Sequence, residues 1–323
     1  MKLLRLLTCI LVFSMFPALS FAWGPIGHMT VAYVAYERLS PAAKARVRDL
    51  LKMNPDYASW ERQIPAGTSA DDHDRAIFIM ASVWPDDIKG ESNYSDDGSN
   101  GGNTPGGAAS SQNLGYGDLL RHKYWHFVDD AFSPDNSPLP PTPVPNARTQ
   151  IAVFRTVLNS ASSDDPLKSY DLVWLIHLVG DVHQPLHATT RVTAKFPQGD
   201  AGGNSVKLFG DAASNLHTYW DDLPGSECKY CADKMQCVNR AIVLGRSLRP
   251  DATKAARNLD ADTWIHESFL AAEKEVYAGP IGTADPYTII PNSQYDLKAY
   301  KLAVKRVRLA GARLAGVLNS ELK

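Results

Sequence analysis

Hydrophobic side chains recur every three or four residues along most of the chain. This period predicts amphipathic helices, over about residues 26–38, 41–53, 69–83, 116–130, 147–160, 166–183, 233–247, 251–276 and 293–321. Ser40 and Pro41 are typical of a helix start, because serine caps the first amides and proline fits the first helical position. The pattern therefore predicts a mainly α-helical protein.

Strand patterns are confined to a short stretch. Residues 205–209 and the segment near Asn215 predict a short β-hairpin. Residues 89–117 are rich in glycine, serine and asparagine, and residues 133–146 contain six prolines, so both predict loops. A loop of nearly thirty residues inside a compact domain is usually functional or disordered. No repeat or linker divides the chain, so we expect a single domain.

The first residues have a different composition. Basic residues precede an apolar run over residues 6–16, and the small residue Ala22 follows it. This order is typical of a secretory signal peptide, here residues 1–22, whose removal leaves Trp23 first in a domain of residues 23–323. The run is too short to span a bilayer, and no later segment has about 18 uninterrupted apolar residues. We therefore expect a secreted or periplasmic protein.

The charge balance limits how this chain can hold an anion. Lys2 and Arg5 are the only charged residues before Trp23, so the mature chain has 31 basic and 35 acidic residues, a net charge of −4. This balance excludes a broad basic face of the kind that holds nucleic acid by charge alone. Bound divalent cations would supply positive charge locally.

Three cysteines follow Trp23, at Cys228, Cys231 and Cys237. They allow one disulfide with three possible pairings. A disulfide in an exported loop is favoured over a metal site, because structural metal sites usually show a second close pair of ligands.

Two segments carry a histidine and an aspartate four residues apart. His177 and Asp181 form the first pair, and His217 and Asp221 form the second. On a helix this spacing places both side chains on one face, where an imidazole and a carboxylate can share a cation. His187 adds an imidazole close to the first pair. A lone histidine on an apolar helix is more often a core residue, but this constellation favours a metal centre.

The whole set of candidate ligands is larger than one ion needs. It comprises five histidines and three aspartates, namely His28, Asp86, His126, His177, Asp181, His187, His217 and Asp221. A zinc ion takes three or four protein ligands, imidazole suits zinc, and carboxylates can bridge two ions. Clustered zinc ions polarise a phosphoryl oxygen and activate water, which indicates hydrolysis of a phosphoester.

Motifs with distinctive composition run through the whole chain after the leader. They are the stretch from Trp23 to His28, Trp84-Pro85-Asp86, the stretch from His126 to Asp129, that from Val179 to His187, Gly202-Gly203-Asn204, the stretch from Asn215 to Asp221, and that from Ala310 to Ala315. In this order they resemble the trinuclear-zinc single-strand nucleases, often called the S-one/P-one nucleases. The resemblance implies three Zn²⁺ ions and a helical single-domain fold related to that of bacterial zinc phospholipase C.

Carried over position by position, the resemblance implies the ligands of each ion. The first ion would be held by Asp86, His126, His177 and Asp181, the second by His187, His217 and Asp221, and the third by Trp23, His28 and Asp181. Trp23 would contribute its α-amino nitrogen and its carbonyl oxygen. Cleavage before Trp23 would then complete the site, because a free amine can lose its proton to a metal whereas a peptide nitrogen is a poor ligand.

Four further residues are candidates for roles at the site, and the resemblance implies those of Asp129 and Lys89. Asp129 would orient the attacking water or a neighbouring cation. Lys89 stands where the family commonly has arginine, and it keeps the charge but loses the bidentate grip. Phe127 would stack on a base or belong to the core. Asn204 would donate to a ligand or substrate, or complete a turn.

The resemblance thus implies a secreted zinc-dependent endonuclease. It would hydrolyse single-stranded DNA and RNA to 5′-phosphate products and act as a 3′-nucleotidase, as a monomer. Two alternatives remain, a zinc-dependent phospholipase C and a non-catalytic zinc-binding protein. We expect structural or surface roles for His73, His122, His183 and His266, and a solvated face for the basic residues Lys301, Lys305, Arg306 and Arg308.

Overall fold

The computed structural model describes residues 23–98, 113–210, 213–226, 228, 233–282 and 287–322. Its longer helices are α1 (Pro25–Tyr36), α2 (Pro41–Leu51), α4 (Ala70–Ala81), α6 (Ala147–Asn159), α7 (Asp165–Asp181), α9 (Lys234–Ser247), α10 (Ala261–Ala271) and α11 (Gln294–Glu321). The shorter helices are α3 (Tyr57–Glu61), α5 (Trp84–Asp87) and α8 (Leu216–Asp222). Single turns are η2 (Gly115–Asp118), η3 (Lys123–His126), η4 (Pro185–Ala188), η5 (Ala255–Arg257), η6 (Ala272–Val276) and η7 (Gly279–Gly282). The fold is mainly helical, as predicted, and the expected leader lies outside the described residues.

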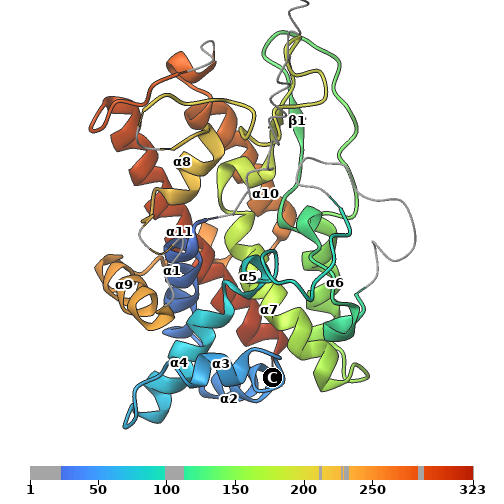
Figure 1. The fold of residues 1–323 in the computed structure, drawn as a ribbon, viewed down its shortest axis with the longest axis vertical. Helices are drawn as coiled ribbons and strands as arrows, with labels where there is room; N and C mark the ends of the chain where they lie inside the picture. Colours follow the sequence, from blue (N-terminus) through green and yellow to red (C-terminus); the bar gives the residue numbers. More distant parts are fainter. Residues whose placement is uncertain are drawn as a thin grey trace, which may run out of the picture.

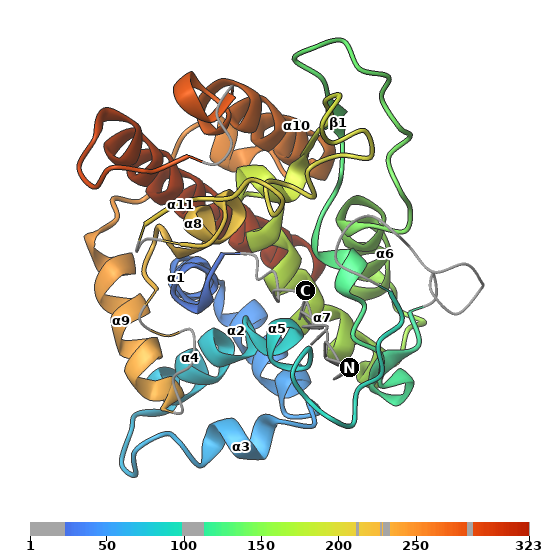
Figure 2. The ribbon, with the colours of Figure 1, turned by 45° about the horizontal axis from the view of Figure 1, so that its top comes forward.

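Two buried helices form the centre of the molecule. α1 packs against α4, α9 and α11, and α7 packs against α1, α2, α5 and α6, an arrangement visible in Figures 1 and 2. Every α7 residue from Ser169 to Asp181 is buried. Gly311 permits the close contact of α11 with α1, since a Cβ there would lie 2.6 Å from the Val34 Cβ. Within the described part of the chain, no helix has the length and apolar character of a membrane span.

The strands differ from the predicted hairpin. β1 (Ala131–Phe132) pairs in parallel with β2 (Thr190–Arg191). At the predicted position a single antiparallel bridge joins Lys207 to Asn215. The bridge is not extended beyond Asn215, because α8 begins at the next residue and the Asn215 side chain caps it by accepting from the Thr218 amide.

Two predicted helices are wrong in extent. Residues 116–130 hold only the turns η2 and η3, because Leu119 and His122 have φ values of 49° and 43°, and a right-handed helix cannot continue through such residues. In residues 251–276 only the turn η5 precedes Ala261, where α10 begins because Asp260 caps it by accepting from the Thr263 amide. The proline-rich loop of residues 133–146 is confirmed.

The predicted solvated face of the last helix is also wrong at one position. Lys301 and Lys305 are exposed, but Arg306 is only 4% exposed. Its guanidinium donates to Glu267 and to the His183 carbonyl, each at 3.0 Å. An ion pair with Glu267 makes this burial possible. The expected structural role of His183 agrees with its buried ring, which lies 2.9 Å from an Arg313 nitrogen.

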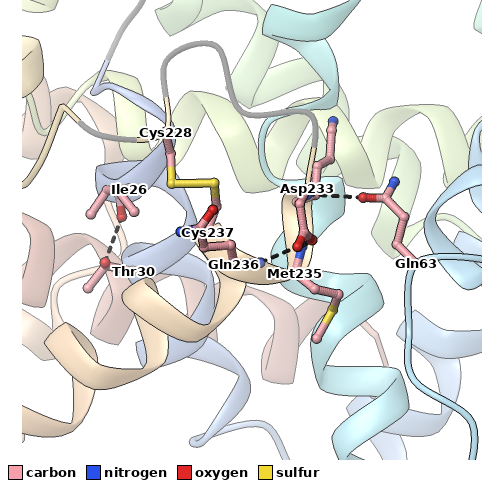
Figure 3. The surroundings of a disulfide bond; sticks show 9 residues. Ile26, Thr30, Gln63, Cys228, Asp233, Met235, Gln236 and Cys237 are labelled. Atoms are coloured by element: carbon pink, nitrogen blue, oxygen red, sulfur yellow. Dashed lines mark hydrogen bonds between the residues drawn. A yellow bond between two sulfur atoms is a disulfide. The ribbon is translucent and has the colours of Figure 1, made fainter.

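The disulfide joins Cys228 to Cys237. Cys231 lies outside the described residues. Figure 3 shows the bridge at the start of α9, where the Asp233 side chain accepts from the Met235 and Gln236 amides. The backbone amide of Lys234 donates to Gln63 at 3.0 Å, so the bridge and this bond both fix the beginning of α9.

A buried ionic cluster holds the segment that leads to His126. His122 has no exposed surface, and its ring nitrogens lie 2.7 Å from Asp97 and 3.0 Å from Asp118. The hydroxyls of Tyr124 and Tyr170 donate to the same two carboxylates. Burial alone would lower the pKa of His122, but the hydrogen bonds and charges of Asp118 and Asp97 outweigh it and raise this pKa.

This cluster predicts a loss of stability as the pH rises. Because the folded-state pKa of His122 is raised above the unfolded value of about 6.5, its stabilisation is complete below that value. The stabilisation is lost as the pH rises through the folded-state pKa. Each kcal/mol of lost unfolding free energy lowers Tm by about 2–4 °C. Thermal unfolding from about pH 6 to about pH 9 should show this fall, and His122→Gln should flatten it. His73→Gln, at a partly exposed histidine, is the control, and an equal slope in His122→Gln would contradict the role.

Candidate metal centre and active site

Buried histidines and aspartates from six elements converge beside the C-terminal end of α7. His28 lies on α1, Asp86 on α5 and His126 at the end of η3, and α7 carries His177 and Asp181. We refer to these five residues as the first group. The second group comprises His187 on η4 and His217 and Asp221 on α8. All eight side chains are buried.

The first group is centred on Asp181. Its Oδ2 atom lies 3.1 Å from His126 Nδ1 and 3.4 Å from His177 Nε2. The two imidazole nitrogens are 2.9 Å apart. Asp86 Oδ1 approaches the same nitrogens, at 3.8 Å from His126 and 3.6 Å from His177. Two carboxylates and two imidazoles thus face one point.

His28 faces the other oxygen of Asp181. Its Nε2 atom is 3.2 Å from Asp181 Oδ1, and its ring stacks on that of His177 with centroids 3.9 Å apart. Gly180 makes this approach possible, because a Cβ there would lie 2.8 Å from His28 Nδ1. The two oxygens of Asp181 therefore face different partners, which is the arrangement that a bridging carboxylate requires.

Trp23 lies at the start of α1, close to the second group. Its side chain is fully buried, and the amide of the following residue, Gly24, donates to the Asp221 carbonyl at 2.8 Å. In the second group the Nε2 atoms of His187 and His217 are 2.9 Å apart. Asp221 Oδ2 lies 3.5 Å from His217 Nε2, and Asp221 Oδ1 lies 3.9 Å from His187 Nε2.

Backbone carbonyls orient three of the imidazoles. The Nδ1 atoms of His177, His187 and His217 lie 2.7, 2.8 and 2.6 Å from the carbonyl oxygens of Ser82, His126 and Gly202, respectively. A carbonyl only accepts, so each Nδ1 carries the proton and each Nε2 presents a lone pair. The lone pairs of His187 and His217 therefore face each other at 2.9 Å, a contact that a shared cation would stabilise.

The donor set fits zinc. Four of these side chains, those of His28, Asp86, His126 and Asp181, have a buried nitrogen or oxygen with no hydrogen-bond partner among the described residues. Burial lowers the pKa of His126 and His187 well below the ordinary value, and that of His177 to about 3, so these imidazoles are neutral. Burial and then Asp86 raise the pKa of Asp181 well above the usual range, so a cation is needed to keep it ionised. Neutral imidazoles with carboxylates are the ligands that zinc prefers.

Lys89 lies among the same residues. The residue is 3% exposed, and its Nζ donates to Asp86 Oδ1 at 2.7 Å. The charge of Lys89 contributes to the lowered pKa of His126 and of His187. The ammonium group is therefore near both groups at once.

The other three predicted site residues lie on loops nearby. Burial and then Asp200 and Asp130 raise the pKa of Asp129 to about 7. Phe127 is partly buried and packs against the main hydrophobic core. Asn204 Nδ2 donates to the Ala201 carbonyl at 2.9 Å, which is the turn role that the sequence left open.

Sequence reasoning missed several residues that support the ligands. The carbonyls of Ser82 and Gly202 carry no side-chain pattern and so give no sequence indication. Gln184, which lies within the central motif, donates to Asp221. The structure also brings Asp86 within the reach of His28 as well as His177, because ligand atoms of these three lie within 4.8 Å of one another.

Several known proteins are similar in sequence to this chain. The model of the S1/P1 Nuclease family matches residues 23–323. Endonuclease 2 of Arabidopsis thaliana is 22% identical over 307 residues, which cover 92% of this chain and 89% of the relative. Nuclease S1 of Aspergillus oryzae is 23% identical over 213 residues, which cover 63% of this chain and 54% of the relative. Because the family model matches every residue from Trp23 onward, the chain belongs to the S1/P1 nuclease family, and it is a hydrolytic nuclease that acts on phosphodiester bonds.

Proposed function

We propose that residues 23–323 form one secreted, monomeric, zinc-dependent endonuclease domain. Its substrates are single-stranded DNA and RNA, which it cleaves to 5′-phosphate products, and 3′-nucleotides, from which it removes the phosphate. The observation that carries the proposal is the pair of His187 and His217 lone pairs facing each other at 2.9 Å beside buried Asp221.

Three zinc ions would be held by the residues of both groups. Asp86, His126, His177 and Asp181 would hold the first ion, and His187, His217 and Asp221 the second. Trp23, His28 and Asp181 would hold the third. The two oxygens of Asp181, which face His28 and His126, support its sharing between two ions. The family match begins at residue 23, which supports removal of residues 1–22 and a free amine on Trp23.

Bound zinc ions would polarise the phosphoryl group and lower the pKa of bound water. The chain supplies the groups around that chemistry. Lys89 would place its ammonium against the phosphate oxygens and offset the charge that develops on them. The pKa of about 7 lets Asp129 hold or release a proton near neutral pH, next to the water that it would orient.

Two residues beside the metal ligands, Phe127 and Asn204, would recognise the nucleic-acid strand. The partly buried ring of Phe127 offers one face to a base, and stacking of this kind does not require a specific sequence. Asn204 would contact the substrate from the turn that its Nδ2 closes on the Ala201 carbonyl. The ligand side chains are all buried, so an unstacked strand can bend toward them more easily than a duplex.

The test is cleavage of single-stranded DNA and RNA by protein that starts at Trp23, before and after removal of zinc with a chelator. We expect cleavage that stops on chelation, returns with zinc, and leaves 5′-phosphate ends that a ligase accepts. Phosphatidylcholine is assayed in parallel. Turnover of lipid alone, or zinc binding without any turnover, would overturn the proposal in favour of a phospholipase or a binding protein.

A further inference from the structure

Gln184 is a fully buried amide between two ligand-bearing segments. It follows the C-terminal end of α7, which carries Asp181, and its side chain caps the first turn of η4, which carries His187. A buried amide side chain is costly unless its groups are paired. Its bonds therefore show what the residue does.

The oxygen and the nitrogen of the Gln184 side-chain amide form hydrogen bonds with different segments. The Leu186 backbone amide donates to Gln184 Oε1 at 2.6 Å, and Gln184 Nε2 donates to Asp221 Oδ1 at 2.7 Å. The orientation of the amide is determined by these partners, since the oxygen must face the N–H and the nitrogen must face the carboxylate. One side chain thus joins η4 to α8, the two elements that supply the second group.

The bond to Asp221 orients that carboxylate. With Oδ1 engaged by Gln184, Oδ2 is the oxygen that faces His217 Nε2, at 3.5 Å. Partners of this kind fix the direction of a metal-binding carboxylate, and their loss typically weakens metal binding by about 10–100-fold.

The turn that carries Gln184 is anchored independently of its side chain. The Val182 carbonyl accepts from the Ser268 hydroxyl at 2.5 Å, and the His183 carbonyl accepts from Arg306 at 3.0 Å. Loss of the amide therefore leaves the path of the backbone intact.

We propose that Gln184 is a positioning residue that sets the affinity of the second group for its ion by orienting Asp221 and joining η4 to α8. The inference rests on the proposed function, because it takes the second group as a metal site. It predicts that loss of the Gln184 amide weakens the binding of one ion and leaves the binding of the others unchanged.

The test measures zinc stoichiometry and affinity by competition with a chromophoric chelator, for the wild type and Gln184→Met. One ion should bind about 10–100-fold more weakly, and the others should be unchanged. Gln150→Met is the matched control, because Gln150 on α6 is also buried and its Oε1 accepts from the Thr149 hydroxyl. Tm in excess chelator reports the fold itself and should change no more in Gln184→Met than in Gln150→Met.

A second variant separates the two bonds. Gln184→Glu keeps the acceptor for Leu186 but presents an oxygen to Asp221, so it should lose at least as much affinity as Gln184→Met. Normal zinc binding in Gln184→Glu would overturn the inference, as would equal weakening of every ion together with a lower Tm in chelator. Absence of zinc binding in the wild type would instead overturn the proposed function.

Discussion

Asp181→Asn should reduce cleavage of single-stranded DNA by at least about 10³-fold. The carboxylate faces three histidines, and its two oxygens face different partners, so one substitution weakens two proposed ion sites. The expected loss corresponds to several kcal/mol of charge stabilisation in the transition state. Steady-state kcat/KM and bound zinc are the measurements, and both should fall.

Asp171→Asn is the matched control for this change. Asp171 lies on the same helix and is equally buried, but burial raises its pKa to about 8 and its carboxyl accepts from Asn113. It is therefore mostly protonated at neutral pH, and asparagine replaces it with little change in charge. Full activity and full zinc content in Asp181→Asn would refute the shared role.

Lys89→Ala should lower turnover by about 10²–10³-fold, the usual effect of removing one group that stabilises developing charge. The ammonium is buried and is bonded to Asp86. A water molecule in the space left by its removal would be neutral and would not replace its charge. Lys89→Arg should restore much of the rate, because it keeps the charge and can bind phosphate through two nitrogens. The measurement is kcat with zinc content determined on the same samples.

Lys123→Ala provides the comparison. Lys123 is also a largely buried lysine bonded to an aspartate, Asp96, but it follows His122 in the segment before His126 and is not in either group. Its loss should lower Tm without a comparable loss of kcat. If Lys89→Ala binds zinc and turns over at the wild-type rate, the catalytic role of Lys89 is wrong.

Sequence periodicity predicted the helices whose ends are determined locally. The last helix was expected at residues 293–321 and is Gln294–Glu321, because Ser293 caps it through its own side chain. α2 begins at Pro41 as expected, since Ser40 accepts from the Ala43 amide. A cap and an apolar stripe are local properties, and the sequence displays both.

Elements that depend on distant partners were not predictable in this way. Residues 116–130 have an apolar pattern, yet His122 adopts a left-handed conformation between Asp97 and Asp118. The parallel pairing of β1 with β2 joins residues far apart in the chain. In each case a long-range contact outweighs the local preference.

The residues of the candidate site also differ in whether local sequence or long-range contacts reveal them. The pairs His177–Asp181 and His217–Asp221 follow from helical spacing alone, and each pair lies within 3.5 Å in the structure. Asp86 and His28 were candidate ligands, but only the resemblance assigned them to an ion, because no local spacing connects them to α7. Gln184 was recognisable only from the bonds of its amide, which the chain path around it determines.

His126 belongs to the first group and also contacts the second, through different atoms. Its ring faces Asp181 in the first group, and its carbonyl accepts from His187 in the second. The two groups are therefore connected through the covalent bonds of one residue, which do not stretch when helices shift against one another. A shift of the backbone at His126 would therefore move a ligand of the first group and the carbonyl that orients His187 of the second group together.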